Sequence, residues 1–294
     1  MSIFKGSAVA LVTPFTPDGS KIDVERLISL IEFHIENGTD AILVNGTTGE
    51  SPTQSKEEFE LLVSTTVQAV AKRVPVIAGA GSNNTTHSLE LSLSAQNMGA
   101  DALLLITPYY NKGTQTGNLQ HFIAVADRVD IPIILYNVPG RTGINLLPET
   151  IAKAAEHPNI VAVKEASGKI EQVLKIRELC GSDFDIYSGN DDIIVPTLAC
   201  GGVGVISVLA NVAPTATHEM VMEYLNGNTN TALEMQLKYN PLVRALFTEP
   251  NPIAVKRAME LINMSCGPLR LPLTPLEEPH EAQLIEALKD LSLI

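Results

Sequence analysis

The chain has 294 residues, 45% of them hydrophobic, no tryptophan and a formal net charge of −13. This length is enough for one large α/β barrel with an appendage, or for two ordinary domains. The acidic excess argues against nucleic acid or an anionic membrane surface as a partner. No apolar stretch approaches the length of a membrane span, and the first residues lack the apolar segment of a signal peptide, so we expect no membrane association.

The three cysteines, Cys180, Cys200 and Cys266, are isolated along the sequence. An odd number without regular spacing suits a reducing compartment better than a disulfide framework, and it does not resemble a zinc site. We therefore expect a cytoplasmic protein without a cysteine-bound metal.

Eight short apolar runs recur along the chain, and each except the last precedes a longer stretch with helical apolar spacing. Such alternation predicts right-handed βαβ units and a parallel sheet, and eight units predict a closed (β/α)8 barrel. The alternative is an open, doubly wound sheet, but no G-x-G-x-x-G turn follows an early strand. The expected strands are Ala8–Val12, Ala41–Asn45, Val74–Ala78, Ala102–Ile106, Pro132–Tyr136, Ile160–Lys164, Phe184–Ser188 and Gly202–Val208.

The pattern changes after the eighth strand. Pro214–Leu225 predicts the eighth helix, and the remainder of the chain contains only helical patterns, over Thr231–Phe247, Asn251–Met264 and His280–Leu291. We therefore expect a barrel domain over residues 1–225 and a C-terminal helical domain over residues 226–294.

Lys164 lies at the end of an apolar run with the length of a buried strand. Burying a lone cation is costly, and the usual relief is a lowered pKa that leaves a neutral amine. A neutral amine in a dry pocket is the nucleophile that forms a Schiff base with a carbonyl substrate. The alternative is a structural lysine that pairs with Glu165 or with a backbone carbonyl.

Other polar residues cluster where the predicted strands end, which is the active-site face of a (β/α)8 barrel. Thr47 and Thr48 lie in a glycine-bounded loop whose hydroxyl and N–H groups suit a carboxylate, although an ordinary helix cap is equally compatible. Tyr136 ends the fifth strand, and the Pro-Gly turn after it presents Arg141, either as a fork for a carboxylate or as a plain surface arginine. Tyr109 and Tyr110, at the end of the fourth strand, point to opposite sides.

Asp191 and Asp192 come after the seventh strand. An acidic pair suggests a metal, but no histidine or further carboxylate joins it, so we expect a helix cap and no metal. None of the six histidines falls at a strand end. Lys164 is therefore the strongest nucleophile candidate at the barrel mouth.

Five segments together resemble the dihydrodipicolinate synthase family of class I pyruvate-dependent aldolases. They are GTTGES at 46–51, TPYYNK at 107–112, YNVPGRTG at 136–143, VKEASG at 163–168 and SGND at 188–191. The resemblance implies Schiff-base condensation of pyruvate with L-aspartate 4-semialdehyde in diaminopimelate and lysine biosynthesis, with no cofactor. Sibling lyases for sialic acid or 2-keto-3-deoxy sugar acids are one alternative, and they generally lack the arginine. A metabolite-binding barrel without turnover is another.

On this resemblance, Lys164 is the Schiff-base lysine and Tyr136 the general acid/base. Thr47 and Tyr110 complete a hydroxyl relay with Tyr136. In the family, the tyrosine that Tyr110 matches reaches into a neighbouring subunit. This implies a homo-oligomer, a homotetramer built from dimers that share Tyr110.

The resemblance also implies how the substrates bind. Thr48 and the Thr47 backbone would hold the pyruvate carboxylate, and Arg141 would take the carboxylate of the semialdehyde. The backbones of Gly189 and Ile206 would line the pocket near the lysine.

One part of the family pattern is altered in this chain. Lysine-inhibited members bind L-lysine at the dimer interface through histidine and an acidic side chain. Ser51, Asn83 and Tyr109 match that site, but Lys56, Phe59 and His87 occupy its other positions. We predict that feedback inhibition by L-lysine is weak or absent, because a charge partner is lost and Lys56 adds repulsion.

Overall fold

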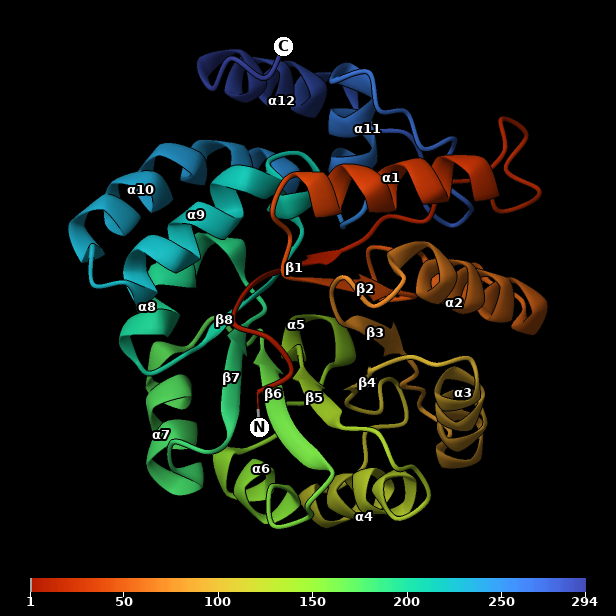
Figure 1. The fold of residues 1–294 in the computed structure, drawn as a ribbon, viewed down its shortest axis with the longest axis vertical. Helices are drawn as coiled ribbons and strands as arrows, with labels where there is room; N and C mark the ends of the chain where they lie inside the picture. Colours follow the sequence, from red (N-terminus) through yellow and green to blue (C-terminus); the bar gives the residue numbers. More distant parts are fainter. Residues whose placement is uncertain (1) are drawn as a thin grey trace.

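Eight parallel strands close into a barrel in chain order, with β1 paired to both β2 and β8 (Figure 1). This computed structural model describes residues 2–294. The predicted (β/α)8 barrel is confirmed, and the open sheet is wrong. The strands are β1 Gly6–Ala10, β2 Ala41–Val44, β3 Val76–Gly79, β4 Ala102–Ile106, β5 Ile133–Asn137, β6 Ile160–Glu165, β7 Asp185–Ser188 and β8 Gly204–Ser207.

Helices surround the barrel on the outside, and three more come after it in the chain (Figure 1). The surrounding helices are α1 Val24–Glu36, α2 Lys56–Val70, α3 Thr85–Asn97, α4 Gln115–Ala126, α6 Pro148–Ala154, α7 Ile170–Cys180, α8 Ile194–Ala199 and α9 Pro214–Leu225. The short helix α5 Pro139–Thr142 lies instead at the end of the barrel, where Arg141 and Thr142 line a cavity. The later helices are α10 Thr229–Leu246, α11 Ile253–Leu261 and α12 Glu278–Asp290, and the short 3₁₀ turns are η1 Ser51–Thr53, η2 Asp191–Ile193 and η3 Leu209–Asn211. Within residues 2–294, no helix has both the length and the apolar character to cross a bilayer.

Successive side chains along each strand point alternately into the barrel and out toward the helices, so each strand contributes to two cores. On β6, Ala162 belongs to the cluster inside the barrel, together with Tyr136 and Ile206, whereas Val163 packs in the cluster between the strands and the helices. Lys164 has the parity of Ala162 and therefore points into the barrel. Phe4 stacks on the inward ring of Tyr187 with centroids 4.3 Å apart, and this apolar plug fills the amino-terminal end of the barrel.

Helices α10 to α12 form the predicted C-terminal helical part. Leu242 of α10 and Leu284 of α12 lie in the same core cluster as Leu27 and Leu30 of α1. The C-terminal helices are therefore attached to the barrel through a shared core. The domain boundary after residue 225 falls between α9 and α10 and stays a prediction.

Candidate active site

Lys164 lies at the carboxyl end of β6 with only 5% of its surface exposed. Its Nζ atom lies 4.4 Å from the ring centroid of Tyr136, the residue opposite it on β5. Burial lowers the pKa of Lys164 to about 8; the charge of Asp191 opposes this shift and that of Arg141 adds to it. Near neutral pH, Lys164 is therefore more often an uncharged nucleophile than an exposed lysine is.

Glu165 does not pair with Lys164. Its Oε1 accepts a hydrogen bond from the Ser167 amide at 2.7 Å, and its Oε2 accepts from Asn137 Nδ2 and Gln172 Nε2, both at 3.0 Å. These donors satisfy the carboxylate on the outer face of β6, opposite to the inward lysine. Of the structural alternatives for Lys164, the ion pair with Glu165 is wrong.

Tyr136 supplies a phenol directly beside the amine. Burial raises its pKa, while the charge of Arg141 and a hydrogen bond with the Thr47 side chain act in the opposite direction. The phenol is thus protonated at neutral pH and able to donate. Thr47, from the loop after β2, gives the Tyr136 proton a second oxygen to exchange with.

Asn251 joins two of the predicted carboxylate-binding residues. Its Nδ2 donates to Thr48 Oγ1 at 2.9 Å, and its backbone carbonyl accepts from Arg141 Nη2 at 3.1 Å. Accepting this bond leaves the Thr48 hydroxyl proton free to donate to a substrate oxygen. Asn251 lies in the connection between α10 and α11, more than a hundred residues from either partner, and no sequence pattern pointed to it.

The loop that carries Thr47 and Thr48 is held from below by Glu50. This residue has φ +57° and a fully buried side chain, whose Oε1 lies 2.9 Å from Lys256 Nζ. Its Oε2 accepts the Arg270 amide at 2.9 Å. Lys256 also donates to the carbonyl of Pro268 at 2.8 Å. The C-terminal part of the chain therefore fixes the position of a loop on the barrel.

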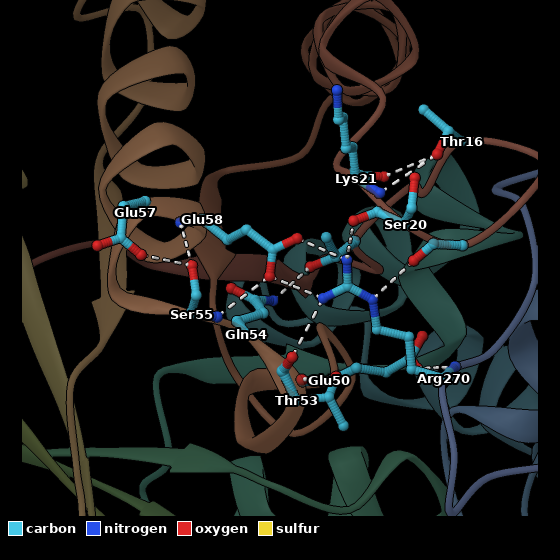
Figure 2. Close-up of polar contacts among 12 residues, drawn as sticks. Thr16, Ser20, Lys21, Glu50, Thr53, Gln54, Ser55, Glu57, Glu58 and Arg270 are labelled. Carbon is cyan, nitrogen blue, oxygen red and sulfur yellow. Dashed lines mark hydrogen bonds and ion pairs between the residues drawn. The ribbon is translucent and has the colours of Figure 1, made fainter.

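The ion pair of Arg270 with Glu58 lies beside the contacts of Glu50 and is drawn in Figure 2. The Arg270 guanidinium forms a two-pronged pair with the Glu58 carboxylate, Nη1 to Oε2 at 2.7 Å and Nη2 to Oε1 at 2.5 Å. Nη1 also donates to the carbonyl of Thr53 at 3.1 Å. Glu58 in turn accepts from the Ser55 amide in the capping box of α2. Arg270 thus ties the loop and the start of α2 to the C-terminal segment.

Gly189, one of the two residues expected to line the pocket, lies against the Lys164 side chain. A Cβ atom on Gly189 would come within 2.6 Å of Ala166 Cβ and 3.2 Å of Lys164 Cε, so a larger residue would clash with Ala166 and crowd the lysine. Ile206, on β8, is 1% exposed and shares the inner cluster with Tyr136.

Asp191 does not cap the helix that follows β7, so that expectation is wrong. Asn190 precedes η2, and no side chain caps this turn. Instead, Asp191 Oδ2 accepts the amides of Val208 at 2.9 Å and Leu209 at 2.8 Å, across the gap between β7 and β8. The carboxylate is used to join two neighbouring strand ends, a long-range contact that a local pattern does not reveal.

A cavity of about 400 Å³ opens at this end of the barrel. Its lining includes Thr47, Tyr136 and Arg141, together with Ser51, His87 and Tyr109. Tyr110 does not join them: it is 88% exposed, with φ +68°. Two of the three residues of the expected hydroxyl relay, Tyr136 and Thr47, therefore meet within a single chain.

One group within residues 2–294 has the spacing of metal ligands, and it lies in the C-terminal helical part. It consists of Glu249, Glu277 and His280. The His280 Nδ1 atom already lies 2.7 Å from Glu249 Oε1, as an ordinary surface pair.

Residues 3–291 match the profile of the dihydrodipicolinate synthetase family. The chain belongs to this family. It is 54% identical over 294 residues to 4-hydroxy-tetrahydrodipicolinate synthase 1 of Clostridium acetobutylicum, and the match covers the whole of both chains.

Solved structures agree with this membership. The crystal structure of dihydrodipicolinate synthase from Thermotoga maritima is 45% identical and superposes with a TM-score of 0.97 over the whole of both chains. The lysine-bound enzyme of Cyanidioschyzon merolae is 42% identical, again with a TM-score of 0.97 and complete coverage of both chains. The family fold thus includes the C-terminal helices.

Proposed function

We propose that this chain is a 4-hydroxy-tetrahydrodipicolinate synthase, an aldolase-type lyase of the Schiff-base class. It condenses pyruvate with L-aspartate 4-semialdehyde, with loss of water, on the diaminopimelate route to lysine. The observation that carries the proposal is the buried amine of Lys164. It lies beside the Tyr136 ring, and burial lowers the pKa of the lysine to about 8. The full-length similarity to a synthase supports the same reaction.

In this proposal, Lys164 Nζ attacks C2 of pyruvate and the resulting carbinolamine loses its hydroxyl as water. Tyr136 donates the proton that the departing hydroxide needs. The protonated imine then withdraws electrons from the pyruvate methyl group, which loses a proton to give the enamine. The imine is the electron sink for this deprotonation. The enamine carbon then attacks the aldehyde carbon of the semialdehyde, and the substrate's amino group attacks the imine carbon, which closes the ring and releases Lys164 as the free amine.

Tyr136 serves repeatedly as acid and base, and for this its proton needs a path. Thr47 is the first member of that path in the same chain. We assign the next member to Tyr110 of a second copy, because the exposed side chain of Tyr110 lies outside its own site. The proposed assembly is a homotetramer built from dimers that exchange Tyr110.

The two substrate carboxylates meet different parts of the mouth. Thr48, whose hydroxyl proton is free to donate, and the Thr47 backbone would hold pyruvate, while Arg141 would hold the semialdehyde. The bond from Arg141 to the Asn251 carbonyl supports this role, since it fixes the guanidinium beside the cavity. Gly189 and Ile206 would line the pyruvate end.

We propose a cytoplasmic location for the enzyme, without nucleic acid, membrane or cofactor as partners. The three cysteines are free, as a reducing compartment maintains them. The negative formal charge of −13 is the feature that disfavours polyanionic partners.

A coupled assay tests the reaction. The protein is mixed with pyruvate and L-aspartate 4-semialdehyde, together with the NADPH-dependent reductase that consumes the product. NADPH oxidation that requires both substrates is expected. Turnover of N-acetylneuraminate or of a 2-keto-3-deoxy sugar acid, with none of the semialdehyde, would assign the chain to a sibling lyase.

A further inference from the structure

Asp191 is a buried carboxylate with one oxygen left over. The residue is 2% exposed, and its Oδ2 accepts the two backbone amides of Val208 and Leu209. Its Oδ1 is also buried and makes no hydrogen bond of normal geometry to the described residues, although the Ser207 side chain lies beside the carboxylate and lowers its pKa. Buried polar atoms are nearly always hydrogen-bonded, so an unpartnered carboxylate oxygen beside a barrel mouth calls for a functional explanation.

The chain brings Asp191 close to the reactive lysine. Gly189, two residues earlier, packs its backbone against the Lys164 side chain, and β7 lies next to β6 in the sheet. The charge of Asp191 raises the pKa of Lys164, and the charge of Lys164 lowers the pKa of Asp191, which burial otherwise raises. The other groups that face Lys164 are Tyr136, through its ring, and the cationic Arg141.

The position of Asp191 is fixed from two directions. Its side chain is tied to the start of η3 through the Val208 and Leu209 amides, and its backbone carbonyl accepts Gln236 Nε2 at 2.8 Å. Gln236, a buried residue of α10, also accepts the Val195 amide at 3.1 Å. The carboxylate therefore cannot turn to solvent without losing both amides, and the Gln236 bond holds the backbone that carries it.

We propose that Asp191 is a positioning residue of the catalytic centre, a fixed buried counter-charge for Lys164 and for the protonated imine formed on it. The inference rests on the proposed function. A preorganised anion stabilises a cationic intermediate without reorganising during the reaction. The Asp191 charge also opposes the effect of burial on the pKa of Lys164. The lysine can therefore exist both as amine and as ammonium during the reaction.

The test compares Asp191→Asn with Asp192→Asn, a neighbouring exposed aspartate as the matched control. Asparagine retains an oxygen to accept the Val208 and Leu209 amides but removes the charge. The measurement is the pH profile of kcat/KM for pyruvate, which reports ionisations of the free enzyme. Loss of the anion should move the acidic limb to lower pH by about one unit or more, and Asp192→Asn should leave it in place.

The amount of pyruvate adduct at equilibrium is the second readout. At pH values well above the pKa of Lys164, where the free amine is uncharged, it should fall about tenfold for each pH unit of that shift, because only the iminium then loses the counter-charge. Well below that pKa it should not change, because the ammonium and the iminium lose the same stabilisation. An Asp191→Asn enzyme that is folded and less active, but whose pH profile is unmoved, would overturn the inference. Should this variant fail to fold, Gln236→Met must show a smaller shift in the same direction, and an unmoved profile there contradicts it equally.

The wild-type protein separates this inference from the proposed function. If borohydride traps no pyruvate on the wild type, the Schiff-base function itself fails. If the wild type is trapped and Asp191→Asn has an unchanged profile, only the counter-charge is wrong.

Discussion

Two lysines of this protein are equally buried but differ in their polar contacts. Lys164 and Lys256 are each 5% exposed, and each ammonium lies over an aromatic ring, at 4.4 Å from Tyr136 and 4.6 Å from Phe15. Lys256 Nζ, however, lies 2.9 Å from the Glu50 carboxylate and donates to backbone carbonyls. Within residues 2–294, Lys164 has no ion-pair partner at such a distance. Burial is therefore common to the two lysines, and the bonded carboxylate of Glu50 is what distinguishes Lys256 from the proposed nucleophile.

The largest expected effect is at Tyr136. Lys164 lies over this phenol, whereas Lys256 lies over the Phe15 ring, which has no hydroxyl. Tyr136→Phe keeps the ring beside Lys164 but removes the acid/base group. We expect kcat to fall by about 10²–10⁴-fold, the usual contribution of general acid/base catalysis. Steady-state kinetics checks this, with Tyr239→Phe in α10 as the control that should retain wild-type activity.

The same variant tests the shared site. Tyr110→Phe should also be nearly inactive, and hybrids of Tyr110→Phe with Tyr136→Phe, formed by reversible dissociation, should regain activity because one of their sites is intact. Verified hybrids without recovered activity would count against a relay that crosses between chains.

The second prediction concerns Lys256 and its partner. Glu50→Gln or Lys256→Met leaves one buried charge uncompensated and should lower the free energy of unfolding by about 3–5 kcal/mol. The double variant should cost clearly less than the sum of the two. Urea unfolding measures all three, and Lys72→Met, which breaks the exposed pair with Asp101, should change stability by only about 0–1 kcal/mol. A single variant as mild as Lys72→Met would remove the structural contrast between the two lysines.

The third prediction concerns Arg141, the cation nearest to the Lys164 chemistry. Arg141→Ala should weaken transition-state binding of the semialdehyde by about 1.5–3 kcal/mol, the usual value of a hydrogen bond to a charged group. Pyruvate adduct formation should remain, because Lys164 and Tyr136 are unchanged. Comparing kcat/KM for the semialdehyde with the rate of trapping separates the two steps, with the exposed Arg128→Ala as control. Equal damage to both steps would place Arg141 in a different role.

The smallest expected effect is that of free L-lysine. The cavity lining includes Ser51 and Tyr109, but His87 lies there in place of an acid. Lys56 on α2 is exposed, and its Nζ lies 3.9 Å from Glu60 Oε1. Titration at subsaturating pyruvate should show weak or no inhibition. Half-inhibition at submillimolar lysine would show that this chain binds the amino acid despite the changed side chains.

The sequence predicted the features that depend on local pattern. Apolar runs located all eight strands to within a few residues, and the end of one run identified Lys164. The contacts it missed join residues far apart in the chain: Glu50 with Lys256, Thr48 with Asn251, and Asp191 with the amides after β8. Such pairs form only when the barrel closes, and no periodicity marks them in advance. Asp191 was visible as an acid after the seventh strand, but the local pattern favoured a helix cap.

Two equally buried lysines should differ in reactivity because, within the described part of the chain, only Lys256 is paired with a carboxylate. This difference can be tested directly. The protein is incubated with pyruvate, reduced with borohydride, digested and analysed by mass spectrometry. We expect a reduced pyruvyl group on the peptide that contains Lys164, none on Lys256, and no label in Lys164→Ala. Labelling of Lys256, or of Lys112 or Lys169 near the barrel mouth, would contradict this explanation.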